Sequence, residues 1–257
     1  MREKLFTKKN LRILKEIAVS DFKVRYQNSI LGYVWTLFKP LLLFAVLYVV
    51  FSVFMRFPVE NYQLYLLLGV IIWNFFAEAT VIALRSFETK QSLITKIYFP
   101  RIIIVLSSTL TSFMTFVLNM LVFFVFLTLS NIGFHLSFFF FIVYVVELYF
   151  IILSVSLIVA ALYVKFRDLS HIWEVLLQVG FWLTPIIYPL SMIPADYHRF
   201  IYLNPLARII EYSRVVFIDG YIPAINLNVV LLLVTVLFFA LSLLIFRKFE
   251  PQIAENI

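Results

Sequence analysis

Residues 181–189 read FWLTPIIYP, and residues 203–206 read LNPL. This proline-punctuated, part-polar block begins at the end of the fifth of six long apolar segments and continues toward the sixth. Apolar segments of that length indicate membrane-spanning helices. We therefore expect an all-α integral membrane protein whose last two spans are joined by an irregular connection on the outer face.

The composition supports this fold class. Hydrophobic residues make up 63% of the 257 residues and charged residues only 14%, whereas soluble domains carry about 25% charged residues. Six spans use most of the chain, so we expect a cytoplasmic segment at 1–35 followed by one membrane domain at 36–257. Cysteine is absent, which excludes disulfides and cysteine metal sites.

Hydropathy and length predict six transmembrane helices. Their expected ranges are 37–55, 64–84, 102–129, 138–164, 172–190 and 227–246. With these spans, 17 of the 21 Lys and Arg residues fall on one side of the membrane. The positive-inside rule then predicts that both termini are cytoplasmic. The net charge of +7 is explained by this topology, so we expect no nucleic-acid partner.

Two segments on the cytoplasmic side are amphipathic. In the N-terminal segment, apolar residues from Leu11 to Phe22 recur at helical spacing between charged ones, which predicts a helix in the membrane interface. It either anchors the chain to anionic lipid or contacts a cytoplasmic partner. Segment 85–101 is either a solvated loop or a short helix, with Leu93 and Ile97 on one side, that docks to a soluble protein.

The outer connection at 189–226 contains signals for two short helices. Asn204 and Pro205 suit a helix cap and first turn, and Gly220 suits a stop. A second helix is expected between Asp196 and Tyr202. We expect both helices to dip into the outer leaflet without crossing it.

Several kinds of chemistry have no sequence signal. The five glycines are far apart and form no nucleotide-binding loop, so any ATP would be hydrolysed by another chain. The three histidines lie in separate loops without metal-ligand spacing. We therefore expect no enzyme activity, no metal and no cofactor in this chain.

Two carboxylates fall within the spans, Glu147 near the midplane and Glu78 nearer the cytoplasmic end. A charge there costs at least ~2.5–3.5 kcal/mol, so each side chain should face the bundle interior or water, or be neutral. One interpretation is proton coupling. The other, which we favour, is a polar tie between helices with Asn74, Asn119 or Gln178.

Aromatic residues recur on one face of two spans. Phe44, Tyr48 and Phe51 follow the first, and Phe181 and Tyr188 follow the fifth beside Thr184. Flat rings suit the apolar faces of sugars, although ordinary bundle packing accounts for such stripes equally well.

Four stretches together resemble the permease subunits of ABC-2 type exporters, in particular the polysaccharide group that exports O-antigen (Wzm-type), teichoic acid and capsule. They are 21–26 with 29–35 and 39–41; 99–101; 167–169; and 181–186 continuing through 203–205 to Arg214.

The resemblance implies a homodimer in the bacterial inner membrane with two separate ATPase subunits, which would bind ATP and magnesium. The substrate would be a polysaccharide on an undecaprenyl-diphosphate lipid. The implied ATPase-coupling residues are Ser86, Phe87, Glu88, Lys90, Leu93 and Ile97. The implied contacts to the lipid diphosphate are Lys23, Arg25, Tyr26 and Lys39. The implied polysaccharide channel consists of Phe44, Tyr48, Phe51, Phe181, Thr184 and Tyr188. The implied outer gate consists of Ile209, Ile210 and Phe217.

Other functions remain open at this point. Within the class, the chain resembles exporters of teichoic acid or capsule, or an ABC-2 exporter of lipids or drugs. From another class, a proton-coupled secondary transporter would use Glu147 and Glu78.

Overall fold

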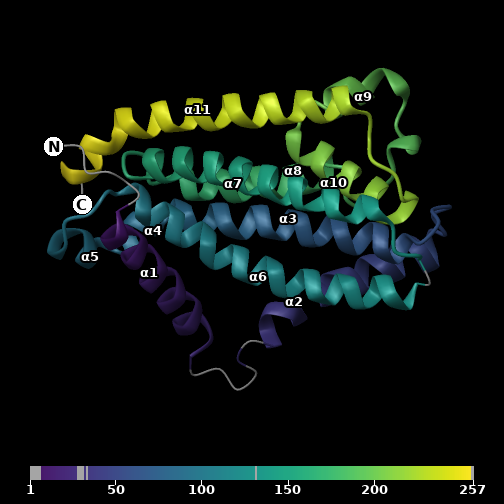
Figure 1. The fold of residues 1–257 in the computed structure, drawn as a ribbon, viewed down its shortest axis with the longest axis horizontal. Coiled ribbons are helices and arrows are strands. Elements are labelled where there is room, and N and C mark those ends of the chain that lie inside the picture. The colour runs from purple at the N-terminus through teal and green to yellow at the C-terminus, as the bar shows by residue number, and fades with distance from the viewer. Residues whose placement is uncertain (1–6, 28–31, 33, 131, 256–257) are drawn as a thin grey trace.

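The computed structural model describes residues 7–27, 32, 34–130 and 132–255, and all regular elements within these ranges are helical. Five helical segments are long and apolar enough to cross a membrane, by length and composition. They run side by side along the molecule (Figure 1). These segments are α2 (Val34–Tyr48) with η1 (Val49–Phe54), α3 (Tyr62–Leu84), α6 (Ile102–Leu129), η2 (Leu136–Phe140) with α7 (Phe141–Tyr163), and α11 (Ile225–Glu255).

The fifth predicted span differs from the expectation. Helix α8 (Leu169–Leu183) ends before residue 190, so the expected boundary is wrong. Thr184 is extended (φ −86°, ψ 136°) because the ring of Pro185 disfavours a helical conformation at the preceding residue. A helix of 15 residues is about 22 Å long, less than the roughly 30 Å of the hydrocarbon core. The structure therefore does not confirm a sixth continuous span.

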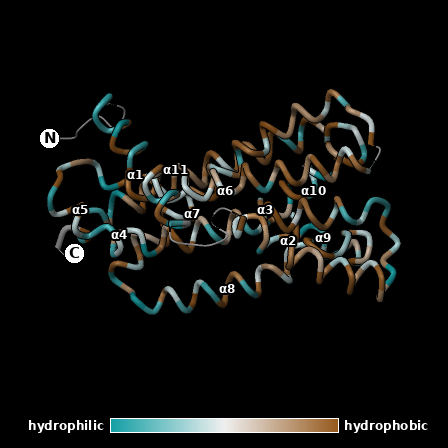
Figure 2. Tube along the Cα trace, turned by 90° about the horizontal axis from the view of Figure 1, so that it is seen from below, coloured by the Kyte–Doolittle hydropathy of each residue, from teal (hydrophilic) through white to brown (hydrophobic). Residues whose placement is uncertain are grey.

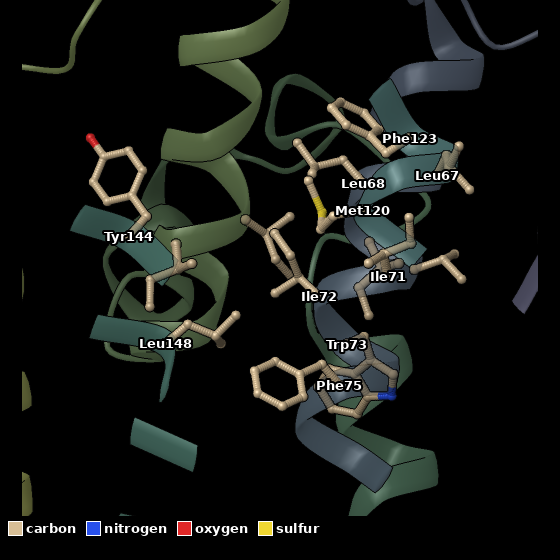
Figure 3. Packing of buried hydrophobic residues seen from close by; sticks show 14 of the residues in the cluster. Leu67, Leu68, Ile71, Ile72, Trp73, Phe75, Met120, Phe123, Tyr144 and Leu148 are labelled. Carbon is tan, nitrogen blue, oxygen red and sulfur yellow. The ribbon is translucent and has the colours of Figure 1, made fainter. Parts of the chain in front are cut away.

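Helix α3 lies at the centre of the bundle. It packs against α2, α6 and α7, and α7 packs in turn against α11. Figure 3 shows side chains of this core, where Ile72 of α3 and Leu148 of α7 are both buried. The most apolar window of α3 is 67% buried, whereas those of α2 and α11 are 17% and 22% buried. Helices α2 and α11 thus keep broad apolar surfaces directed away from the protomer.

One end of the bundle carries α1 (Lys8–Tyr26), α4 (Ser86–Thr89), α5 (Gln91–Lys96) and the end of α11 (Figure 1). We call it the α4–α5 end, and hydrophilic colours gather around its helices in Figure 2. The predicted N-terminal helix is confirmed, with Thr7 accepting a hydrogen bond from the backbone N–H of Asn10. Segment 85–101, for which a solvated loop and a short helix were both possible, contains two short helices, α4 and α5.

The opposite end, which we call the α9–α10 end, carries η3 (Leu190–Met192), α9 (Ala195–Ile201), α10 (Pro205–Arg214) and η4 (Val215–Asp219). The two short helices expected here are present. Asn204 accepts a hydrogen bond from the N–H of Leu206, and Pro205 stands in the first turn. Gly220 ends η4 at φ 76°, a conformation that glycine adopts without strain.

Candidate functional site

A cavity of about 780 Å³ lies where α2, α3 and α6 meet the last turn of α1. Its lining mixes apolar side chains with charged groups, amides and hydroxyls. The polar members are Arg25, Thr36, Lys39, Asn74, Glu78, Thr115 and Asn119. Charged side chains within membrane-spanning segments cost free energy unless they pair with one another or line a functional cavity.

Arg25 of α1 forms an ion pair with Glu78 of α3 across this cavity. The Nη1 of Arg25 also lies 3.4 Å from the Oγ1 of Thr115 on α6. Sequence reasoning treated Glu78 as a tie to an amide, and it did not predict that α1 supplies the partner. Both side chains keep about a third or less of their surface exposed, so the pair lies at the edge of the cavity.

The cations expected to contact a lipid diphosphate are only partly brought together. Arg25 and the exposed Lys39 line the cavity, whereas Lys23 is not among its lining residues. The side chain of Tyr26 and residues 29–31 and 33 of the neighbouring motif lie outside the described part of the chain. A guanidinium and an ammonium that line the same cavity are groups that proteins use to bind phosphate oxygens. The cavity therefore has the chemistry of a site for an anionic head group.

Helix α4 is held by contacts with the protomer, although Glu88 and Thr89 are themselves exposed. The ring of Phe87 is fully buried and stacks on Phe246 of α11, with centroids 6.2 Å apart. Glu88 accepts hydrogen bonds from the hydroxyl of Tyr163 at 2.9 Å and from Nη1 of Arg167 at 2.7 Å. These contacts join α4 to α11 and to the connection between α7 and α8.

Lys90, which follows α4, is held from two other helices. It pairs with Asp21 of α1, and its Nζ lies 3.3 Å from Oγ of Ser107 on α6. Burial lowers the pKa of Lys90, and the neighbouring Asp21 carboxylate opposes that shift. Ser86 is buried as well, and its Oγ has no hydrogen-bond partner in the described structure.

Residues 91–98, which follow Lys90, are the more exposed part of this region. Gln91, Ser92, Thr95 and Lys96 are exposed, and Leu93 is half-buried. Ile97 and Tyr98 expose 44% and 73% of their surfaces. Of the six residues assigned to coupling by resemblance, Ser86, Phe87, Glu88 and Lys90 contact or are buried in the protomer, and Ile97 faces outward. The segment thus has an inner half, α4, and an outward half, residues 91–98.

The predicted channel residues do not gather around the described cavity. Phe44 packs edge-on against Phe126, and Tyr48 stacks on Tyr62. Phe181 meets Trp73 at 6.0 Å between ring centroids. The remaining members are Phe51, which is half-buried against the core, Thr184, which is buried, and Tyr188, whose hydroxyl donates to the carbonyl of Trp182. Their role as a channel stays a prediction.

The predicted gate residues are buried inside the protomer. Ile209 and Ile210 expose none of their surface, and Phe217 exposes 1%. The Phe217 ring packs among Phe123 and Phe141, with centroids 5.1 and 4.8 Å away. The three residues therefore belong to the core beneath the α9–α10 end, and their gating role stays a prediction.

A feature that sequence reasoning missed is a clamp on the four carbonyls after α8. Nη1 and Nη2 of Arg214 donate to the carbonyls of Pro185 at 2.6 Å and Ile186 at 2.7 Å. The hydroxyls of Tyr62 and Tyr65 donate to the next two carbonyls, those of residues 187 and 188, at 2.9 and 3.1 Å. We call these three donors the 185–188 clamp. In a bilayer, carbonyls outside a helix need such partners.

Arg214 is itself fixed on all sides. Its guanidinium lies 3.4 Å from the ring centroid of Tyr65, and Nη1 pairs with Glu211 at 2.5 Å. Gly69 leaves the room for it, since a Cβ there would lie 2.7 Å from Nη2. The sequence does contain a signal for this clamp, because Arg214 lies on the buried and mainly apolar face of α10.

Glu147 is the second intramembrane carboxyl. It exposes 3% of its surface, and its Oε2 has no hydrogen-bond partner in the described structure. Such a group is far more stable in the bilayer as a neutral acid than as a carboxylate. Within the described ranges, no group of three or more His, Asp or Glu side chains has the arrangement of a metal site.

Comparison with known proteins agrees with this picture of a polytopic membrane protein. The family model described as ABC-2 type transporter matches residues 13–218. The chain therefore belongs to the ABC-2 type transporter family, as the sequence resemblance implied.

Among the relatives is the O-antigen export system permease protein RfbA of Klebsiella pneumoniae, 31% identical over 95% of this chain and 94% of that protein. The protein of the same name from Myxococcus xanthus is 28% identical, with 95% of both chains covered. The polysialic acid transport protein KpsM of Escherichia coli is 23% identical, again with 95% of both chains covered.

Proposed function

We propose that this chain is the membrane subunit of an ATP-driven exporter that moves an O-antigen-type polysaccharide on a lipid diphosphate across the bacterial inner membrane. The observation that carries the proposal is the cavity lined by Arg25 and Lys39, which combines cations with sugar-compatible amides next to apolar spans. The names of the RfbA relatives support the same cargo. The KpsM relative, whose name refers to polysialic acid transport, supports another polysaccharide as the cargo. Capsule export is therefore the alternative within the class.

In this proposal the α4–α5 end is cytoplasmic, both termini lie there, and the α9–α10 end faces outward. The excess of Lys and Arg on the cytoplasmic side supports that orientation. The short helix α8 would be the fifth of six spans, continued toward the outer face by residues 184–189, which include the four carbonyls held by the 185–188 clamp. The cations of the cavity then lie toward the cytoplasmic leaflet, where a lipid-linked substrate is made.

A second copy of the chain would complete the channel. The apolar surface of α2 is largely uncovered in one protomer. A two-fold dimer is the commonest assembly of such chains and would bring the uncovered faces of two copies to one path.

The outward half of the coupling segment is the proposed docking surface for the ATPase. Ile97 and Tyr98 are largely apolar and exposed, and Pro100 follows them two residues before α6 begins. The inner half, through Phe87, Glu88 and Lys90, would pass the movement to α11, α7 and α1.

The first test is therefore copurification. Ile97→Asp together with Tyr98→Asp should reduce the ATPase that copurifies with the tagged chain at least about tenfold, because two charges would enter an apolar contact. Export should fall with it. The measurement is the ATPase-to-permease ratio after purification in mild detergent.

Tyr221→Asp is the matched control, since Tyr221 exposes 58% of its surface at the opposite end of the bundle. It should leave the ratio unchanged. Undiminished ATPase on the double variant would contradict the docking surface, and a chain that exports without any ATPase would contradict the proposed class.

Glu147 favours one rival, a proton-coupled carrier, because it is a buried carboxyl without a partner on Oε2. Our proposal predicts that Glu147→Gln, which resembles the neutral acid in shape and polarity, retains most of the export activity. Export measured in cells should stay within about twofold of the wild type if ATP drives transport. Abolished export with normal membrane abundance would instead support the carrier.

A further inference from the structure

We propose that Glu78 is a built-in counter-ion for Arg25, which the substrate's phosphate must displace in order to bind. The inference rests on the proposed function, because it assigns the lipid diphosphate to the cavity beside α1. It adds a step that the charges of that cavity require, namely an exchange of one anion for another on the same guanidinium.

Arg25 is already paired with a carboxylate inside this cavity. Its guanidinium forms an ion pair with Glu78, which belongs to α3. Thr115 of α6 lies within 3.4 Å of the same guanidinium nitrogen. Arg25 is thus oriented by groups of the membrane bundle although it belongs to the interface helix.

The charges that line the cavity also favour an exchange of anions on Arg25. Among the described residues, the charged ones that line the cavity are Arg25, Lys39 and Glu78. With Glu78 ionised, they leave one net positive charge for a ligand that carries at least two negative ones. A diphosphate that reached Arg25 would stand beside the Glu78 carboxylate, and like charges at that range repel strongly in a medium of reduced polarity. Binding and the intact ion pair therefore exclude one another.

The pair is also weak enough to exchange. Arg25 and Glu78 expose 27% and 32% of their side chains, so the protomer does not enclose the pair. A partly exposed ion pair contributes less stability than a buried one, and a bidentate contact to phosphate binds the guanidinium more strongly. In the absence of substrate, Glu78 keeps Arg25 oriented and prevents it from holding other phospholipid head groups.

Helix α1, which carries Arg25, also contacts Lys90 at the end of α4. Asp21 lies one turn before Arg25 on α1 and pairs with Lys90. Thr111 of α6 donates to the carbonyl of Ala18 one turn earlier still. Helix α1 thus connects the proposed head-group site to the residues that follow α4.

The test is a binding measurement on the full chain in lipid nanodiscs, with undecaprenyl diphosphate as the probe. Undecaprenyl monophosphate and inorganic pyrophosphate are the comparison ligands, which separate recognition of the lipid head group from binding of free phosphate. Glu78→Gln should bind the lipid diphosphate at least about threefold more tightly than the wild type, since the competing charge is gone. Arg25→Gln should bind it at least about tenfold more weakly.

Glu174→Gln is the matched control. Glu174 pairs with Arg85 at 3.5 Å, is about half exposed and is not among the cavity's lining residues, so its loss should leave the affinity unchanged. In the double variant Glu78→Gln with Arg25→Gln, the gain from the first change should disappear, because it acts through Arg25.

Equal or weaker binding by a folded Glu78→Gln variant would overturn the exchange while leaving the proposed function intact. Wild-type protein that does not distinguish the lipid diphosphate from the other two ligands would instead overturn the proposed ligand, and the exchange with it. Should the variant not fold, spin labels at Val24 and at Arg85, which directly follows α3 and does not line the cavity, provide a second test in the otherwise cysteine-free chain. Their separation should increase when wild-type side chains at 25 and 78 meet the ligand, and an unchanged separation would refute the exchange.

Discussion

Arg214→Gln should lower the free energy of unfolding by about 3–5 kcal/mol, the range found when one member of a buried ion pair is removed. The change leaves the Glu211 carboxylate, which is 16% exposed, without its partner. It also removes the donors to the carbonyls of Pro185 and Ile186. Unfolding by sodium dodecyl sulfate in mixed micelles, followed by tryptophan fluorescence, measures the loss.

Two further variants show whether the clamp or the charge alone matters. Arg214→Lys keeps the charge but lacks the planar fork that reaches two carbonyls at once, so an intermediate loss is expected. Arg199→Gln, on the exposed face of α9, should change stability by less than about 0.5 kcal/mol. If Arg214→Gln unfolds together with the wild type, the clamp does not hold residues 185–188.

Phe87→Ala should have an effect of similar size for a different reason. The ring is fully buried between α4 and α11, and truncation of a buried phenylalanine leaves a void that costs about 3–5 kcal/mol. Because this void separates α4 from Phe246, export should fall further than the loss of folded protein explains. Thermal unfolding and export normalised to membrane abundance give the two quantities.

Phe166→Ala is the control for the Phe87 experiment. Phe166 exposes 54% of its surface in the connection after α7, so its truncation should leave both quantities close to wild type. A stable Phe87→Ala variant with full export would show that α4 is not held through this ring.

The spans were predictable because an apolar run of about 20 residues matches the thickness of the hydrocarbon core and is rare in soluble proteins. The range 102–129 is confirmed as α6, and the starts of α3 and α11 fall within two residues of the expectation. The end of α8 was missed although its signal, Pro185, was visible. Hydropathy continues through 184–190, and the local rule for the residue before a proline is the one that holds there.

The partners within the candidate site were less predictable. Arg25 and Glu78 are 53 positions apart, and Tyr62 and residue 187 are 125 apart. A sequence shows that a charge in an apolar span needs a partner, but only the packing of α1 on α6 and of α3 in the centre determines which one. For the same reason, the resemblance that implies a coupling role for Phe87 and Glu88 does not show their partners. Phe87 is buried against α11, and the exposed Glu88 is held by Tyr163 and Arg167.

The clamp also sets an order of assembly. Its tyrosine donors belong to α3, which is synthesised early, and its arginine belongs to α10, which leaves the ribosome after residues 185–188 themselves. Until α10 has emerged, two of the four carbonyls lack the donors that the hydrocarbon phase requires. Truncated and released chains that end between residues 190 and 210 should therefore keep residues 185–188 exposed to water. The insertion of this stretch should be among the last steps in the biogenesis of the protein.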